Sequence, residues 1–571
     1  MELITPYGGT LCDRYLDSAA ALELKDAACE YPSWDLSPRQ LCDVEMLLAG
    51  GFSPLTGFLT RADYERVCRE MRLTDGTLWP MPVTLDVSQA FADELGDQAR
   101  VALRDAEGVL VAVLDLEERW TPDREQEARE VFGTTDPAHP GVACLLERSG
   151  PVCLGGTLHG VERPMHYDFR TYRYTPAELR EHFRALGWNR VVAFHTRSPM
   201  HRAQLELTRR AARETEANLL IHPVVGPTAP GDVDHFVRVR CYEHILRRAP
   251  EATTQLSLLP LAMRLAGPRE ALWHALIRRN YGCSHFIVGH DHAGPGPNSR
   301  GEAFYAPGAA QELLARHRDE IGIEIVPVQQ MDYVEDCAQY LPADQRQPGQ
   351  SVLHLSDAEF RRRLDEGLEI PEWYSPAEVV EELRRAFPPR HQQGFTVFFT
   401  GLSGAGKSTI ANALRVKLME LGGRAVSLLD GDIVRKELSR ELGFSREHRD
   451  LNVQRIGYVA SEITKNGGVA ICAPIAPYTS MRRRVRERIE AVGGFLEVYV
   501  ATPLETCEQR DRKGLYAKAR AGLVKEVTGI DDPYEEPEHP ELRLDTREMT
   551  ADEAAQRVLL KLEAEGYIRI G

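Results

Sequence analysis

A glycine-rich segment in the last third of the chain has the spacing of a phosphate-binding loop. It comprises Gly401, Leu402, Ser403, Gly404, Ala405, Gly406, Lys407, Ser408 and Thr409. In such a loop the backbone N–H groups surround nucleotide phosphates, the lysine reaches the β- and γ-phosphates, and the next hydroxyl ligates Mg²⁺. We therefore predict that these nine residues bind ATP with Mg²⁺, and that Lys407 is catalytic and Ser408 a metal ligand.

A second polar group follows the next strand-like run. Asp430 and Asp432 come directly after residues 425–429, and Arg435 lies three positions further on. Carboxylates beside a phosphate loop can hold Mg²⁺ or accept a proton from an acceptor hydroxyl, and an arginine can bind a second anion. This arrangement indicates a small-molecule kinase in which Asp432 is catalytic and binds Mg²⁺. For Asp430, capping of the following helix is the competing interpretation.

The flanking sequence supplies the elements that such a loop needs. An apolar strand pattern, Phe395–Thr400, precedes it, and apolar residues at helical spacing, from Ile410 to Leu421, follow it. Upstream, a helical pattern over 376–387 ends at two prolines, and the polar stretch 390–394 has the composition of a linker. We therefore expect a separate domain to begin near residue 392.

The region before this linker changes character near residue 170. Residues 1–165 contain short strand-like runs, such as 78–87 and 109–116, whereas from about 175 strand patterns at 190–194, 218–225 and 284–289 alternate with helical ones such as 272–279. The predicted fold class is α/β. A β-rich N-terminal module is followed by a Rossmann-like α/β domain and a C-terminal P-loop kinase with a parallel sheet.

Composition excludes several classes of partner. The 571 residues include 69 Lys and Arg against 86 Asp and Glu, a formal charge of −17, so we expect no nucleic-acid and no membrane partner. The apolar runs fall short of the roughly 18 residues that span a bilayer. Eleven cysteines are scattered without a C-x-x-C pair. We expect a cytoplasmic protein without a structural metal.

Residues 392–571 resemble the adenylyl-sulfate (APS) kinases. Besides the phosphate loop, the similarity rests on LLDGDIVR (428–435), LGFSREHRDLNVQRI (442–456), IAPY (475–478) and residues 510–537. The resemblance implies transfer of the γ-phosphate of MgATP to the 3′-hydroxyl of APS, which gives 3′-phosphoadenylyl sulfate. It also implies that APS is bound by Arg435, Phe444, Arg449, Asn452 and Lys513. Arg449 and Asn452 are three residues apart, so on a helix they share a face.

This region departs from the family pattern at several positions. Ala476 replaces a serine proposed as a phosphorylated intermediate, so we expect direct in-line transfer. Val527 replaces a phenylalanine that, in the family, makes a second aromatic contact with the APS adenine. We expect this change to weaken APS binding by about 1 kcal/mol and Val527→Phe to restore it. The basic run Arg482–Arg484 is expected to be a solvated helix face.

Residues 1–388 resemble the ATP sulfurylases, which join sulfate to the α-phosphorus of ATP and are often fused to APS kinase. The similarity rests on GGFSPLTGFL (50–59), HPVVGPTAPGDVD (222–234) and GHDHAGPG (289–296), among other segments. It implies a PUA-like module over 1–168 and a sulfurylase-like domain over 169–388, before a kinase domain over 392–571. The related fusions, which are often hexamers, imply a homo-oligomer.

The sulfurylase-like site differs from the family motif Gln-x-Arg-Asn-Pro-x-His-x-x-His. Arg197 and His201 match the motif, whereas the changed positions are His195, Ser198, Gln204 and, in a second motif, His290 in place of arginine. Loss of one preorganised donor at developing charge typically costs about 2.7–4 kcal/mol. We therefore predict an APS kinase whose sulfurylase activity is absent or strongly impaired. The alternatives are a fully bifunctional sulfate adenylyltransferase and APS kinase, and a structural or regulatory scaffold.

Overall fold

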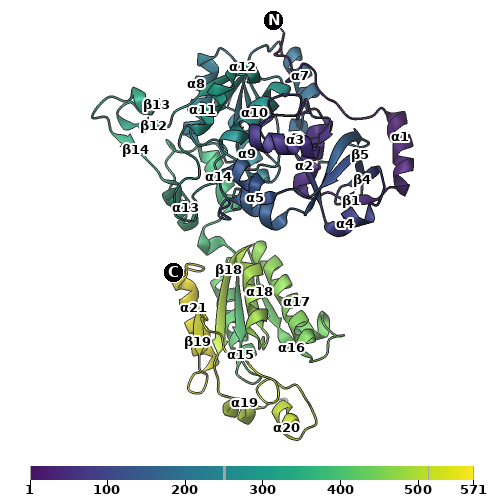
Figure 1. Cartoon of the computed structure of the whole chain (residues 1–571). Helices are drawn as coiled ribbons and strands as arrows, with labels where there is room; N and C mark the ends of the chain where they lie inside the picture. The colour runs from purple at the N-terminus through teal and green to yellow at the C-terminus, as the bar shows by residue number, and fades with distance from the viewer. Residues whose placement is uncertain (1, 249–251, 512–513, 570–571) are drawn as a thin grey trace. The chain divides into compact units, whose positions relative to one another are not determined.

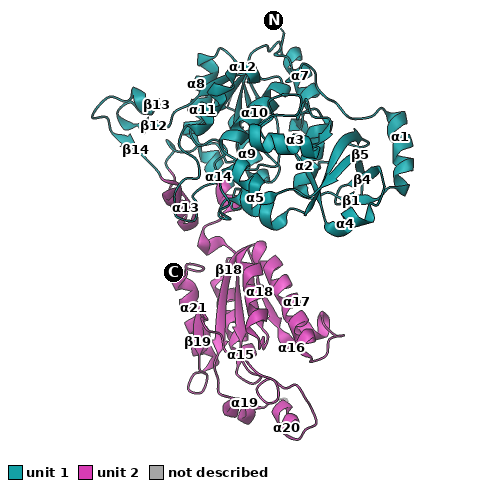
Figure 2. Cartoon of the chain, viewed as in Figure 1, with its two compact units in different colours: residues 1–355, 371–382 teal, residues 356–370, 383–571 magenta. Residues whose placement is uncertain are grey.

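The chain forms two compact units (Figure 2). The computed structural model describes residues 2–248, 252–511 and 514–569. Unit 1 comprises residues 1–355 and 371–382, and unit 2 comprises 356–370 and 383–571. The fold class is the expected α/β arrangement with parallel sheets. The finer division into 1–168, 169–388 and 392–571 stays a prediction.

The first part of unit 1 is built on a mainly antiparallel six-stranded sheet (Figure 1). Its order is β1 (Ser33–Asp35), β4 (Arg100–Arg104), β5 (Leu110–Trp120), β6 (Val152–Gly160) and β2 (Gly57–Phe58), and β3 (Leu85–Val87) also pairs with β6. The strand expected over residues 78–87 is therefore mostly wrong. Pro80 and Pro82 lack the N–H that a ladder needs, so only the last three residues of that run form a strand, and Leu78 makes one isolated bridge with Arg72.

The second part of unit 1 contains a parallel five-stranded sheet. Its order is β11 (Glu324–Pro327), β10 (His285–Val288), β7 (Val191–Thr196), β8 (Asn218–Pro223) and β9 (Thr254–Leu256). β10, with neighbours on both sides, is fully buried, which explains the continuous apolar run Phe286–Val288 after its first residue. The parallel pairing places the carboxyl ends of β7 and β10 at one edge of the sheet.

The helices of unit 1 cover these sheets, and a small antiparallel sheet completes it. That sheet has the order β13 (Gln339–Pro342), β12 (Met331–Val334) and β14 (Val352–Leu353). α10 (Pro268–Asn280) is buried on nearly all sides, so its sequence shows no polar face. The other longer helices are α1 (Ser18–Ala27), α2 (Pro38–Leu48), α3 (Arg61–Glu70), α7 (Pro176–Ala185), α8 (Arg202–Glu214), α9 (His235–Leu246), α11 (Ala309–Arg316) and α14 (Ala377–Ala386), which continues into unit 2.

Unit 2 is a parallel five-stranded sheet with helices on both faces (Figure 1). Its order is β16 (Val426–Asp430), β17 (Val469–Ala473), β15 (Phe395–Thr400), β18 (Gly494–Val500) and β19 (Leu542–Leu544). One apolar core includes side chains of α15 (Lys407–Leu421) and α21 (Ala551–Ala564), and another includes those of α17 (Arg446–Lys465) and α18 (Thr479–Glu490). The remaining helices are α13 (Asp357–Glu366), α16 (Gly431–Glu437), α19 (Leu504–Arg510) and α20 (Leu515–Arg520).

Candidate functional site

The phosphate-loop segment connects β15 to α15, as its sequence context predicts. Gly401 has φ +144°, and a Cβ there would lie 2.5 Å from the Val500 carbonyl oxygen. The hydroxyls of Thr502 and Thr546 both donate to the Ala405 carbonyl at 3.1 Å. The loop therefore has a fixed shape that a side chain at its first position would disrupt.

Lys407 and Ser408 both make contacts within this site. The Lys407 ammonium donates to the carbonyls of Gly401 (2.9 Å) and Leu402 (2.7 Å), so it lies over the loop. The Ser408 hydroxyl donates to Asp430 Oδ2 at 2.6 Å. Asp430 Oδ1 accepts from the backbone N–H of Asp432 and caps α16. Asp430 therefore caps the helix and also contacts the loop.

The Ser408–Asp430 pair is the part of the site best suited to Mg²⁺. A hydroxyl and a carboxylate supply the hard oxygen ligands that Mg²⁺ prefers. The sequence prediction assigned Mg²⁺ to Ser408 and Asp432, but the structure puts Asp430 next to Ser408, whereas Asp432 lies exposed in the first turn of α16. The signal for Asp430 was its place at the last residue of a strand.

Arg435 and Phe444 lie together, and Arg435 belongs to α16, the helix that Asp430 caps. The guanidinium carbon of Arg435 is 4.6 Å from the centroid of the Phe444 ring, and the ring is 62% exposed. Burial lowers the pKa of Arg435, and the nearby charge of Arg449 lowers it further. Two predicted APS-binding arginines are thus close enough to repel each other, which favours an anion between them.

Arg449 is held by a polar network that the sequence did not reveal. Its Nη1 donates to Thr528 Oγ1 at 2.8 Å and forms an ion pair with Asp532, while Nη2 donates to the Glu526 carbonyl. The Tyr478 hydroxyl donates to the other Asp532 oxygen at 2.6 Å. Asp532 therefore joins α17 to the segment 526–532, and only the fold brings these residues together.

The other predicted APS-binding residues have different surroundings. Asn452 lies three residues after Arg449 on α17, it is 5% exposed, and its Oδ1 has no hydrogen-bond partner in the described part of the chain. A buried, unpaired amide oxygen is a group that a ligand donor can satisfy. Lys513 lies outside the described residues. Val527 is 5% exposed and belongs to the core of unit 2, so it does not line an open face.

The basic run on α18 differs from expectation at one residue. Arg482 is 3% exposed, its Nε lies 3.0 Å from Glu497 Oε1, and its Nη1 donates to the Ala476 carbonyl at 2.8 Å. The expected solvated face is therefore wrong for Arg482. The side chains of Arg483 and Arg484 are 73% and 50% exposed, as a solvated face requires.

The sulfurylase-like motif lies at the carboxyl ends of β7 and β10 in unit 1. Arg197 Nη2 donates to the Gly294 carbonyl at 3.1 Å and so links the loops that follow these two strands. Its Nη1 lies 3.4 Å from Asp232 Oδ2. Ser198 and His290 are exposed. The edge where the strands end is the usual ligand side of an open parallel sheet.

Two other motif residues have structural partners. His201 Nδ1 lies 2.9 Å from the Ser375 hydroxyl. The Gln204 side chain accepts from the His201 backbone N–H at 2.9 Å and completes a capping box at the start of α8. Gln204 therefore stabilises the helix end, a role that needs no ligand.

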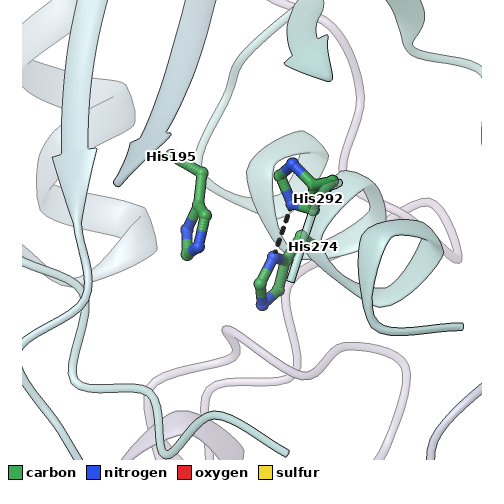
Figure 3. Close-up of side chains that lie close together, drawn as sticks. All are labelled: His195, His274 and His292. Atoms are coloured by element: carbon green, nitrogen blue, oxygen red, sulfur yellow. Dashed lines mark hydrogen bonds between the residues drawn. The ribbon is translucent and has the colours of Figure 1, made fainter. Parts of the chain in front are cut away.

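His195 belongs to a cluster of three histidines with His274 and His292 (Figure 3). Its ring centroid is 4.4 Å from that of His274 and 5.1 Å from that of His292, and His274 Nδ1 lies 3.0 Å from His292 Nε2. Burial lowers the pKa of each ring well below its usual value, so all three are neutral at pH 7.

The histidine cluster is the one set of described side chains with metal-ligand spacing. Arg278 Nη2 lies 2.9 Å from His195 Nδ1 and can only donate. That contact leaves the proton of the neutral His195 ring on Nε2, so His195 offers no free lone pair while the contact holds. The cluster is therefore not assembled for a metal ion.

The fold and loop of unit 2 define a P-loop phosphotransferase, and unit 1 carries the sulfurylase-like motif on its own parallel sheet. Three family models match the chain in succession: a PUA-like domain at residues 4–163, ATP-sulfurylase at 170–386 and adenylylsulphate kinase at 393–545. No described helix combines the length and the apolar character needed to cross a bilayer.

Relatives match over the whole length. A sulfate adenylyltransferase of Phaeosphaeria nodorum is 52% identical over 99% of both chains, and one of Chaetomium globosum is 53% identical over the same shares. A solved hexameric APS kinase from Thiobacillus denitrificans is 45% identical, covers 100% of both chains and superposes with a TM-score of 0.81.

The chain belongs to the family of fusions of ATP sulfurylase with APS kinase. The recognition of both regions from sequence is confirmed, and the chain is an enzyme with an APS kinase domain. The predicted loss of sulfurylase activity is not supported, because relatives with more than half of their residues identical are named for that activity. The comparisons favour the bifunctional alternative.

Proposed function

We propose that unit 2 transfers the γ-phosphate of MgATP to the 3′-hydroxyl of APS. The observation that carries this proposal is the joint placement of the phosphate loop, the Ser408–Asp430 pair and the adjacent Arg435 and Arg449. A nucleotide triphosphate and a second anion both require such positive potential in a chain of net charge −17. The match to the adenylylsulphate kinase model supports the choice of APS as acceptor.

The residues divide between holding the two substrates and moving one proton. Lys407 binds the β- and γ-phosphates, and Ser408 with Asp430 holds Mg²⁺, which neutralises phosphate charge when bound. Arg435, Arg449 and Asn452 bind APS, and the exposed Phe444 ring stacks on its adenine.

Asp432 accepts the proton of the 3′-hydroxyl as transfer proceeds in line. Ala476 has no side-chain oxygen, so no phosphoserine forms at that position.

APS-dependent release of ADP from MgATP tests this proposal. We expect the full chain to release ADP only when APS is present, and Lys407→Ala to lose at least 10²-fold in kcat, since the phosphates lose their cation. Arg415→Ala, a change at an exposed residue of the same helix that leaves the loop intact, is the control. ADP release at the same rate with and without APS, or near-normal turnover by Lys407→Ala, contradicts the proposal.

A second candidate function, sulfate adenylyltransferase, belongs to unit 1. The names of the full-length relatives favour it, and Arg197 and His201 match the family motif. The predicted impairment rests on the changes at His195, Ser198, Gln204 and His290. The contacts of Gln204 with the α8 cap and of His195 with Arg278 agree with lost ligand contacts, but they measure no activity.

ATP formation from APS and pyrophosphate decides between the two hypotheses. Robust ATP formation by the full chain establishes the bifunctional enzyme and ends the impairment hypothesis. Activity at least about 10⁴-fold below that of a sulfurylase with the intact motif, as expected if several donors are lost, supports impairment. Arg197→Ala separates true turnover from contamination, because only activity at this site requires Arg197.

We also propose that the chain forms a homo-oligomer, with the hexameric Thiobacillus denitrificans protein as a guide to its size. Light scattering on the purified full chain measures the oligomer mass. A monomer at micromolar concentration contradicts this part of the proposal.

A further inference from the structure

A cavity of about 310 Å³ lies at the amino ends of the central strands of unit 2. The first residues of β15, β16 and β17 line it: Phe395, Val426 and Val469. The phosphate loop follows the opposite end of β15. With a rise of roughly 3.3 Å per residue, the six residues of that strand separate the two sites by about 17 Å. The cavity is therefore distinct from the nucleotide site.

The charged residues lining this cavity are all basic. His391, Arg424 and Arg569 line it, and its lining contains no Asp or Glu. The Arg424 guanidinium carbon lies 4.9 Å from the Phe395 ring centroid, and its nitrogens donate to the carbonyls of Gln393 and Tyr567. Among the described residues neither Arg424 nor Arg569 forms an ion pair, so no described carboxylate balances the charge of these two guanidinium groups.

Two further observations agree with this positive potential. Burial lowers the pKa of His391, and the charges of Arg569 and Arg424 lower it further. Burial also lowers the pKa of Arg424, although a guanidinium keeps its charge at pH 7. A bound anion would relieve both penalties.

Apart from Gln392, the rest of the cavity wall consists of apolar side chains and two glycines. Leu418 and Leu421 come from the last turns of α15, and Ile568 comes from the C-terminal segment. A Cβ at Gly422 or Gly423 would meet nothing within 4 Å, so the chain leaves room there. A volume of this size is at the lower end of the range for small-molecule sites.

We propose that this cavity binds a small organic anion, with its acidic group between Arg424, Arg569 and His391 and an aromatic or aliphatic body against Leu418, Leu421 and Ile568. The cations favour a ligand with negative charge, and the apolar wall favours an organic anion over an inorganic one. The site is independent of the proposed kinase reaction, since it shares no residue with the phosphate loop.

Fluorescence titration with 8-anilinonaphthalene-1-sulfonate tests this site on the full chain, with saturating MgADP present to occupy the phosphate loop. Leu421 is 45% exposed, so both Leu421→Glu and Leu421→Lys are expected to fold. We expect saturable binding to wild type, at least 10-fold weaker binding to Leu421→Glu and to Arg569→Glu, and binding to Leu421→Lys at least threefold tighter than to Leu421→Glu.

Arg557→Glu is the matched control, because Arg557 is an exposed residue of α21 outside the cavity lining. It makes the same charge change and should leave binding unaltered. The proposal is overturned if Leu421→Glu and Leu421→Lys bind the dye with equal affinity, or if wild type shows no saturable binding. It is also overturned if Arg557→Glu loses as much affinity as Arg569→Glu. If inorganic sulfate displaces the dye as strongly as benzoate does, the apolar wall does not contribute to selectivity.

Discussion

Replacing Asp532 by asparagine tests whether this carboxylate positions Arg449 for APS. The two side chains are 12% and 19% exposed, so solvent screens their ion pair only in part. Asparagine keeps the size and an oxygen for the Tyr478 hydroxyl but removes the negative charge. A hydrogen bond to a charged group contributes about 1.5–3 kcal/mol. If Arg449 binds APS from this position, Asp532→Asn should therefore raise the KM for APS about 10- to 100-fold.

Steady-state assay of ADP release with each substrate varied in turn measures this effect. The KM for ATP and kcat should stay within about threefold of wild type, because Asp532 contacts neither Lys407 nor Ser408 in the described structure. Tyr478→Phe removes only the neutral partner and should raise the KM for APS by threefold or less. An unchanged KM for APS refutes the positioning argument. A lower KM would show that Asp532 competes with the substrate anion for Arg449.

Two more predictions concern the interior of unit 2. Val527→Phe should lower the free energy of unfolding, measured by denaturant titration, by about 1–3 kcal/mol, because Val527 is in the core and a larger ring overpacks it. Tighter APS binding at unchanged stability would instead support the stacking hypothesis. Arg482→Ala should lower the free energy of unfolding by about 3 kcal/mol, since Arg482 is one of two cations paired with buried Glu497. Arg483→Ala, at an exposed residue, should change the free energy of unfolding by less than about 0.5 kcal/mol.

Local motifs explain why the kinase loop was predictable from sequence. The strand, the nine-residue loop and the helix are contiguous, and β15 has the bounds that its apolar run predicts. The Asp532–Arg449 contact was not predictable, because 83 residues separate its partners and only the fold brings them together. Asp430 was partly predictable: its place at a strand end indicated a polar role, but the contact with Ser408 depends on where β16 lies in the sheet.

Pattern reasoning failed where two physical effects compete. The run 78–87 is apolar enough for a strand, yet Pro80 and Pro82 cannot donate to a ladder and most of it does not pair. The run Arg482–Arg484 is uniformly basic, yet helical rotation turns Arg482 towards the buried Glu497 on β18 while its neighbours face solvent. Charge alone does not tell which residue of a helical run points inward.

The cationic groups of the kinase site have internal partners before any substrate binds, and this affects its energetics. The Lys407 ammonium contacts two loop carbonyls, and Arg449 pairs with Asp532. A substrate anion binds a cation that already has an internal partner, so the affinity it gains is smaller than the full strength of one charge-assisted interaction. The same contacts hold these side chains near their working positions, which reduces the ordering that binding requires. Loss of an internal partner such as Asp532 is therefore expected to change the KM for the substrate and not the rate of phosphate transfer.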